Sequence, residues 1–319
     1  MPEPDASLAL TLTRFHDPTA FARVAEPLML RDEAANCLQL GLLDALRAGQ
    51  YREPFLATVD AYGSQPLLSV MMTPPYRLIL GEPAAERDAA ALMAPVLDAL
   101  PAGLPGVLGP VDLSGCFAEA YARRHGVSAT LALAERIYRC ERVTPPSGVA
   151  GRMRRATAAD LELLVAWRRA FREEAATGDP ASDREAVERD LSQDPGGLWF
   201  WEVDGEPVSM AGARGPTPSG IRVGPVYTPP ELRGRGYAGA LVGALTALVM
   251  LATAGGVTYF TFNPGAIAEP RYTGLLAGAP QVVGSVEDVI NHFSEYQAQL
   301  AGLVGNVSQL YQVTSTLPV

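Results

Sequence analysis

Alternating apolar and polar positions open the chain and then give way to helical spacing. LALTLTRF (residues 8–15) predicts a strand, and apolar residues recur at helical spacing across 21–46. Three further strands are expected at PFLATVDAY, LLSVMMT and YRLIL, because each is a short apolar run that ends at turn residues. The half is completed by a helix over 86–100, a short strand GVLGPV, a helix over 117–126 and a long strand over 129–143.

The second half repeats this order of elements. GRMRRAT starts a strand, and helices are predicted over 158–175, which has one apolar face, and over 183–191. GLWFWEVDG and EPVSMAGARG form a hairpin, because Asp204-Gly205 between them is a strong two-residue turn signal. The strand GIRVGPVYT, a loop, an uncharged helix and the strand VTYFTFN follow.

The repeated order predicts two domains of one type. Each half has a strand, helices, three antiparallel strands, a helix and a strand, so the fold class is α+β, with a mixed, mostly antiparallel sheet and helices on both faces. VTPPSGVAG has the composition of a linker. We therefore assign residues 1–142 to a degenerate, non-catalytic copy, 143–151 to the linker and 152–319 to the second domain.

The run from Tyr237 to Tyr259 contains no charged residue and is long enough to cross a membrane. However, it is rich in Ala, Gly and Thr, Gly255 and Gly256 interrupt it, and the strand-like VTYFTF follows at once. A helix that is apolar on all sides in a soluble protein lies buried between a sheet and another layer. We therefore expect no association with a membrane.

Charge and cysteine content narrow the function classes. The formal net charge is −10, and every basic residue is Arg because the chain has no Lys. No broad basic face is available for nucleic acid, and the acidic balance suits cationic partners such as amines. The 3 cysteines are scattered without CxxC spacing, which indicates reduced thiols, no metal site and a cytoplasmic location. The N-terminal MPEPDASLAL does not have the pattern of a signal peptide.

The chemistry of the chain concentrates in the loop VYTPPELRGRGYA, residues 226–238. Gly234 and Gly236 permit positive φ before the uncharged helix, so that successive backbone N–H groups can face one anion. Arg233 and Arg235 add donors that suit phosphate oxygens. The two prolines free the preceding strand from further pairing, so its last amides could bind an extended, amide-bearing ligand.

Arg233-Gly234-Arg235-Gly236-Tyr237-Ala238, with a strand before it and a helix after it, resembles the Gln/Arg-x-x-Gly-x-Gly/Ala motif of the GNAT superfamily of acyl-CoA-dependent N-acyltransferases. The resemblance covers about residues 151 to 265 and extends to the first half as a degenerate copy. It implies transfer of an acetyl group from acetyl-CoA, as co-substrate and without a metal, to an amine in a ternary complex. GxGxxG, GKS/T, HExxH and GxSxG patterns do not occur, so the corresponding enzyme classes lack support.

The resemblance also implies roles for individual residues. Those assigned to acetyl-CoA are Val226, Tyr227 and Thr228 for the pantetheine arm, Arg233, Gly234, Arg235, Gly236, Tyr237 and Ala238 for the pyrophosphate, and Asn263 after the fifth strand. A backbone N–H near Val226 or Tyr227 would polarise the thioester carbonyl. By the same resemblance, Tyr272 would protonate the leaving thiolate. The base is assigned from the residues alone: Glu202, on the aromatic strand that contains Trp199 and Trp201, with Glu173 and Glu174 at the end of the preceding helix as alternatives. Trp199 and Trp201 share a face of their strand, for core packing or as a wall of the acceptor pocket.

The segment from about 265 to 319 departs from the family's pattern. Pro270 lies two residues before Tyr272, and apolar spacings of three and four predict a helix over 285–311. Such a helix would pack on the other domain or pair two chains as a homodimer. The acceptor is left open among a small amine, an antibiotic, a peptide N-terminus and a protein lysine. A non-catalytic CoA-binding or protein-interaction module is the alternative function.

Overall fold

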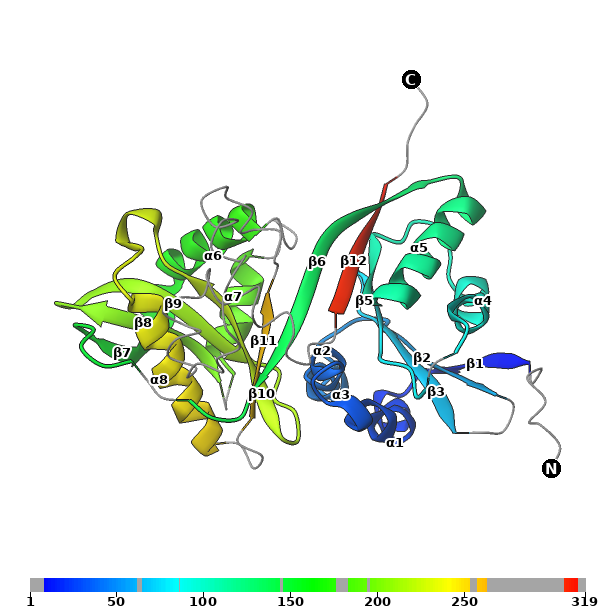
Figure 1. The fold of residues 1–319 in the computed structure, drawn as a ribbon, viewed down its shortest axis with the longest axis horizontal. Coiled ribbons are helices and arrows are strands. Elements are labelled where there is room, and N and C mark those ends of the chain that lie inside the picture. The colour runs from blue at the N-terminus through cyan, green and yellow to red at the C-terminus, as the bar shows by residue number, and fades with distance from the viewer. Residues whose placement is uncertain are drawn as a thin grey trace, which may run out of the picture. The chain divides into compact units, whose positions relative to one another are not determined.

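A computed structural model describes most of the chain, as residues 9–61, 65–85, 87–143, 146–175, 183–193, 196–252, 257–262 and 307–314. It forms two compact units (Figure 1). Unit 1 is Met1–Glu135 together with Asn306–Val319, and unit 2 is Arg136–Gly305.

Unit 1 begins with a strand and a run of helical segments that precede the next strands of an antiparallel meander. Its elements are β1 (Leu10–Phe15), α1 (Pro18–Met29), η1 (Leu30–Asp32), α2 (Cys37–Leu40), α3 (Leu43–Arg47), β2 (Phe55–Ala61), β3 (Pro66–Met72), β4 (Leu78–Leu80), α4 (Ala89–Ala99), β5 (Gly106–Pro110), α5 (Val111–His125), the first part of β6 (Ser128–Cys140) and β12 (Val307–Thr314).

The sheet of unit 1 is covered by helices on both faces. Strands β1 to β4 pair antiparallel in sequence order, and β4 pairs parallel with β5. Ala57 and Val59 of β2 pack into a cluster with α4 and α5, whereas Leu56 packs with α1 to α3. Neighbouring residues of a strand point to opposite faces, so the alternation along β2 places one helical layer on each side.

Unit 2 repeats the order strand, helices, three strands, helix, strand. Its elements are β7 (Arg152–Arg155), η2 (Ala158–Asp160), α6 (Leu161–Ala175), α7 (Asp183–Leu191), β8 (Gly197–Val203), β9 (Glu206–Arg214), β10 (Gly220–Tyr227), η4 (Pro230–Leu232), α8 (Tyr237–Ala252) and β11 (Val257–Phe262).

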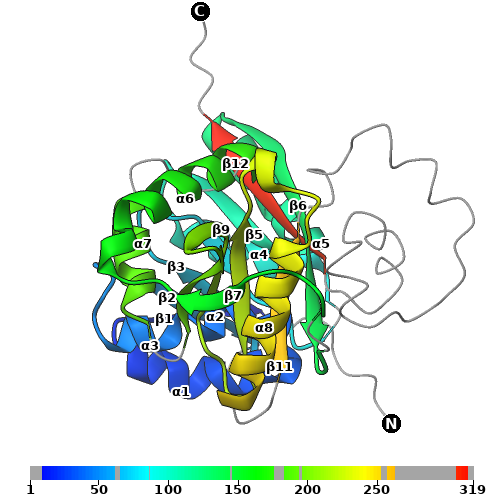
Figure 2. The ribbon, with the colours of Figure 1, turned by 90° about the vertical axis from the view of Figure 1, so that its left-hand side faces the viewer.

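Helices also cover both faces of the sheet in unit 2 (Figure 2). Strands β7 to β10 pair antiparallel in sequence order, and β10 pairs parallel with β11. Met210 of β9 packs with α6 and α7, while its neighbour Ala211 packs with α8. The uncharged helix therefore has a sheet to pack against, as its composition predicts.

These units confirm the predicted fold class, a mixed and mostly antiparallel α+β arrangement. The uncharged run is divided between α8, which ends at Ala252, and β11, which begins at Val257. Within the described part of the chain, no helix has the combination of length and apolar character that a membrane crossing requires.

The two units each receive a strand that the sequence alone did not assign to them. In unit 2, Arg136–Cys140 of β6 pairs antiparallel with β11. In unit 1, β12 pairs antiparallel with β5, its Leu310 opposite Leu108. The fifth strand of each half thus has an equivalent neighbour, β6 in unit 2 and β12 in unit 1. The two compact units divide between Glu135 and Arg136, ahead of the predicted linker 143–151. The assignment of that linker as the boundary between two functional domains stays a prediction.

The helix predicted over 285–311 is wrong where it overlaps β12, because Val307–Thr314 is a strand. Apolar residues four positions apart lie on one face of a helix and also on one face of a strand, so the pattern fits both structures. The pairing with β5 selects the strand. The rest of the predicted helix lies outside the described residues.

Asp160 fixes the beginning of α6. Its carboxylate accepts hydrogen bonds from Thr157 N at 2.7 Å and from Arg154 Nη1 at 2.9 Å, and Thr157 and Asp160 form a capping box. The Arg154 hydrogen bond is the largest cause that lowers the pKa of Asp160, from 3.8 to about 2. The ionised carboxylate therefore stabilises the folded chain above pH 4, and this contribution is lost as the pH falls from about 4 to about 2.

We predict that Asp160→Asn lowers the free energy of unfolding of unit 2 at pH 7 by roughly 1 kcal/mol. This is less than the free energy that corresponds to the whole pKa shift, because solvent screens this partly exposed pair. The difference from the parent should shrink towards pH 2. Urea unfolding at several pH values measures it. Asp204→Asn, in the β8–β9 turn, removes a carboxylate from a turn at positive φ that Asn also adopts, and serves as the control. A pH-independent deficit for Asp160→Asn would contradict the assignment.

We also predict that Leu310→Pro exposes β5 to solvent exchange. Proline removes a backbone donor from β12 and is poorly tolerated inside a ladder. Amide hydrogen exchange in Gly106–Gly109 should accelerate by roughly fivefold or more, since disruption of the ladder at Leu310 costs at least about 1 kcal/mol. The β8–β9 ladder of unit 2 is the internal control. Unchanged protection of β5 would mean that β12 does not pair there in solution.

Candidate functional site

Strand β10 leads into the candidate site and changes its pairing before it ends. It pairs parallel with β11 at Gly220–Val223, opposite Val257–Phe260. On its other side it pairs with β9, and the register shifts between Val223 and Val226. A bulge re-aims the residues that follow it. The last residues of β10 therefore emerge beyond the parallel ladder, directly before the glycine-rich loop.

The loop after η4 has two glycines in the left-handed region, Gly234 at φ 75° and Gly236 at φ 80°. Helix α8 starts immediately afterwards, and Ala240 N donates to Gly236 O at 2.9 Å. A Cβ at Gly236 would lie 3.2 Å from Val149 Cγ2, whereas one at Gly234 would meet nothing within 4 Å. The first amides of a helix lack partners within the helix and attract anions. The loop and the start of α8 thus have the backbone conformation that an anion site at a helix N-terminus requires.

The two loop arginines differ in how they are held. Arg233 Nε donates to Thr228 O at 2.8 Å, and its Nη2 lies 2.6 Å from Glu174 Oε2 at the end of α6. Its guanidinium also lies 5.8 Å from the centre of the Tyr227 ring. Arg235 makes a single longer hydrogen bond, from Nη2 to Glu231 O at 3.3 Å. Arg233 therefore ties the loop to β10 and α6, while Arg235 is the more weakly held cation.

The residues before the loop are fixed from the neighbouring strand. Ser209 of β9 is buried, and its Oγ donates to Tyr227 O at 3.2 Å and lies 2.8 Å from Thr228 Oγ1. Tyr227 packs with Trp167 of α6, with 6.0 Å between ring centres. Burial, reinforced by the Glu174 carboxylate, raises the pKa of the Tyr227 phenol, which is therefore protonated at neutral pH. Val226 packs on the opposite face, towards α8.

Glu202, the carboxylate assigned as base, lies on β8 opposite Arg152 of β7. It is only 7% exposed. Its Oε2 is 3.3 Å from Arg154 Nε and 3.7 Å from Arg152 Nε, without the geometry of a hydrogen bond to any described residue. The carboxylate is thus a buried member of an ion pair at the β7 side of the sheet, two strands away from β10.

The tryptophans considered for an acceptor pocket pack in the core of unit 2. Trp201 is 9% exposed, and its Nε1 donates to Ala150 O at 2.9 Å. Trp199 packs against the same cluster on the α8 side and donates to Gly196 O at 3.1 Å. Core packing therefore accounts for both rings. Asn263 and Tyr272, the remaining assigned residues, lie outside the described part of the chain.

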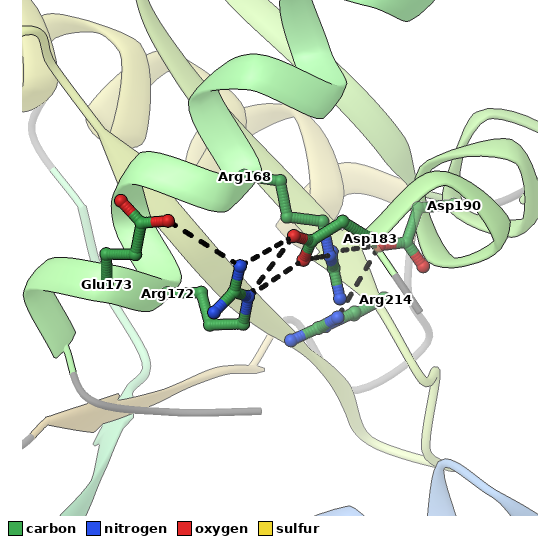
Figure 3. Close-up of polar contacts among 6 residues, drawn as sticks. All are labelled: Arg168, Arg172, Glu173, Asp183, Asp190 and Arg214. Carbon is green, nitrogen blue, oxygen red and sulfur yellow. Dashed lines mark hydrogen bonds and ion pairs between the residues drawn. The ribbon is translucent and has the colours of Figure 1, made fainter. Parts of the chain in front are cut away.

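A buried ionic cluster holds α6, α7 and β9 together, and it was not predicted (Figure 3). Asp190 Oδ2 accepts from Arg168 Nη1 at 3.1 Å and from Arg214 Nη1 at 3.4 Å. Asp183 Oδ2 accepts from Arg172 Nη2 at 3.1 Å. Asp183 is 5% exposed and Asp190 is 3% exposed. Buried carboxylates are stable only when paired and hydrogen-bonded, so these contacts fix the spacing of the two helices.

Burial also acts on the arginines of this cluster. It lowers the pKa of Arg168, the neighbouring Arg214 adds to the effect, and the two aspartates oppose it. The sequence contains a signal for the cluster: Arg168 and Arg172 are four residues apart on α6, and Asp183 and Asp190 are seven apart on α7. Each spacing puts both side chains on one helical face.

Comparison with known families identifies a domain in this part of the chain. Residues 162–269 match the model of the acetyltransferase (GNAT) family. The matched segment includes the glycine-rich loop, α6, α7 and β8 to β11. The resemblance inferred from the loop is therefore confirmed for this segment, and the match supports acyl transfer as its class of activity. No curated protein gives a significant match to the chain.

Solved structures share the fold of nearly the whole chain. A Drosophila protein is 14% identical with a TM-score of 0.60, and the match covers 95% of this chain and 98% of that one. A GCN5-related N-acetyltransferase from Sphaerobacter thermophilus is 15% identical with a TM-score of 0.50, covering 99% and 98%. One from Kribbella flavida is 14% identical with a TM-score of 0.50, covering 89% and 96%. At these identities the likeness concerns the fold alone.

We predict that Gly236→Val weakens acetyl-CoA binding by more than about tenfold, because a β-branched residue at positive φ is strained and would also press against Val149. Isothermal calorimetry on the folded variant measures the change. Gly49→Val is the matched control, since Gly49 of unit 1 has φ 69° with open space around it. It should lower stability without affecting binding. Equal dissociation constants for parent and Gly236→Val would contradict the anion site.

Proposed function

We propose that this chain, which carries a GNAT acetyltransferase domain over residues 162–269, is an acetyl-CoA-dependent N-acetyltransferase. The observation that carries the proposal is the loop with two glycines at positive φ. It lies between β10, whose last residues extend beyond its parallel ladder with β11, and the start of α8. Such a site suits a ligand with a pyrophosphate at one end and an amide-bearing arm at the other.

In this proposal the loop binds the pyrophosphate and the end of β10 binds the pantetheine arm. The amides of residues 234–238 and the guanidinium groups of Arg233 and Arg235 supply donors to phosphate oxygens, while Val226, Tyr227 and Thr228 supply backbone groups to the arm. The loop residues Arg233, Gly234 and Arg235 are exposed, which fits access for a solvated ligand. Asn263 is retained as a further proposed contact.

The proposed reaction is direct attack of a neutral amine on the thioester carbonyl. A backbone N–H at Val226 or Tyr227 would stabilise the oxyanion that forms. The C–N bond forms, the C–S bond breaks, the amine loses a proton and the CoA sulfur leaves as a thiolate that gains one. We propose Glu202 as the base that takes the first proton and Tyr272 as the donor of the second.

The acceptor is proposed to be a cationic small-molecule or peptide amine. The net charge of −10 favours the approach of such a molecule. Glu173 and Glu174 extend this acidity to the end of α6, next to the loop. Pairing of two chains through the C-terminal segment is a separate proposal from the sequence, and the activity described here does not depend on it.

One site per chain is proposed, because unit 1 is closed at the equivalent place. There β4 stays in contact with β5 to its last residue: a Cβ at Gly109 would lie 2.8 Å from Leu80 Cβ. Behind β4, Gln39 Nε2 donates to Ile79 O at 3.0 Å, and Ser69 Oγ donates to Gln39 Oε1 at 2.6 Å. These buried side chains use the polar groups that an extended ligand would need.

We predict that the intact chain binds acetyl-CoA at a single site and transfers its acetyl group to an amine. Calorimetry gives the stoichiometry, and release of the CoA thiol with a panel of amines gives the turnover. Gly236→Val is the inactive control in the turnover assay.

Two equivalent calorimetric sites would contradict the closure of unit 1. Tight binding without turnover on small amines, peptides and protein lysines would instead favour a non-catalytic CoA-binding module. An absence of binding would remove the proposed function altogether.

A further inference from the structure

Glu174 makes the shortest polar contact of the candidate coenzyme loop with α6. Its Oε2 lies 2.6 Å from Arg233 Nη2, across 59 residues of sequence. Both side chains are about half exposed, 46% for Glu174 and 47% for Arg233. The carboxylate therefore reaches the loop from the end of α6 and pairs with the first residue of its Arg-Gly-Arg-Gly run.

The same guanidinium is held from two other directions. Its Nε donates to Thr228 O at 2.8 Å, and its plane lies near the Tyr227 ring, 5.8 Å from the ring centre. Thr228 is itself fixed to the buried Ser209 of β9. Arg233 thus connects the loop to two elements of the unit, the end of β10 through its Nε and the end of α6 through Glu174.

Among the described residues, these contacts use only part of the donor capacity of Arg233. A guanidinium has five N–H groups. The hydrogen bonds to Thr228 O and Glu174 Oε2 use one on Nε and one on Nη2. Glu174 can therefore orient Arg233 while the guanidinium still donates to a phosphate oxygen, so binding does not require the ion pair to break.

We propose that Glu174 is a positioning residue for acetyl-CoA: it holds Arg233 against the end of β10 and so keeps the Gly234–Gly236 turn in its binding conformation before the coenzyme arrives. The proposal rests on the proposed function of the loop. A turn that contains two glycines has much conformational freedom to lose on binding. Contacts that order it beforehand improve affinity by reducing this loss.

The ionic cluster of Figure 3 supports the rigidity that this role requires. Arg172, two residues before Glu174 on α6, is paired with the buried Asp183. Arg168, one turn earlier, is paired with Asp190, which also binds Arg214 of β9. The end of α6 is thereby anchored to α7 and the sheet. Glu174 extends from a fixed helix and so can restrain the loop.

The test is a double-mutant cycle of E174A and R233A, with acetyl-CoA affinity measured by calorimetry on variants whose melting temperatures are near that of the parent. E174A should raise the dissociation constant in the parent. In the R233A background it should have no comparable effect, because the group that it positions is absent. The ratio of the two effects is expected to be about fivefold, as for an effective exposed pair. E174Q, which still accepts a hydrogen bond, should recover part of the affinity.

The matched control is E162A. Glu162, at the first turn of the same helix, forms an exposed ion pair of 2.7 Å with Arg184 of α7 and makes no hydrogen bond or ion pair with the loop in the described part of the chain. E162A should leave the dissociation constant unchanged. With an active amine, E174A should raise KM for acetyl-CoA. A kcat that falls by more than about twofold would mean that Glu174 acts in the chemical step, as the alternative base, and would overturn the inference.

Failure of this inference can be told apart from failure of the proposed function. If the parent binds acetyl-CoA and the cycle gives a ratio near one, Glu174 does not act through Arg233, and the coenzyme site itself stands. Tighter binding by E174A in the parent would mean that Glu174 competes with phosphate, which also overturns the inference. If the parent binds no acetyl-CoA, the proposed function fails and the inference fails with it.

Discussion

The candidate site depends on a backbone conformation that side-chain-bearing residues adopt only at a cost. Gly234 and Gly236 both have φ near 80°, and this geometry turns the chain from the end of β10 into the start of α8. The bulge after Val223, the hydrogen bond from Arg233 to Thr228 O and the packing of Val149 beside Gly236 all surround this turn. In the proposed function this turn presents backbone amides to acetyl-CoA, and contacts that order it beforehand would raise affinity.

Much of the fold could be predicted from the sequence because period-two and helical apolar patterns alternate clearly along both halves. The glycine-rich loop could also be identified from the sequence, because Gly and Arg at this spacing between a strand and a helix are typical of an anion-binding turn. The neighbours of β5 and β11 could not be predicted, because apolar alternation identifies a strand and one face but not its partner. The helix predicted for residues 307–311 is wrong for the same reason, because the apolar pattern does not show that this segment pairs with β5.

The candidate site residues show the same difference between local patterns, which the sequence reveals, and contacts between distant segments, which it does not. Gly234 and Gly236 were identified by local chemistry, and the structure gives both positive φ. Glu174 was considered only as a base, because its contact with Arg233 joins positions 59 residues apart and has no local signature. Glu202 was chosen for its place on an aromatic strand, and its pairing with Arg154 depends on the β7–β8 register. The roles assigned to acetyl-CoA contacts and to proton transfer stay predictions, including those of Asn263 and Tyr272 outside the described residues.

The pairing of β12 with β5 in unit 1 has a consequence for the order in which the protein can fold during synthesis. Domains generally fold from the N-terminus as the ribosome releases them. Here β5, at Gly106–Pro110, takes as its antiparallel partner a strand that begins only at Val307. Unit 1 is therefore translated first, yet its sheet cannot be completed until almost the whole chain has been made. Meanwhile β5 has an unpaired edge, and such an edge is a site where other chains can add. In unit 2, by contrast, Arg136–Cys140 of β6 is translated before the other elements, so every described strand of its ladder is present once β11 has left the ribosome.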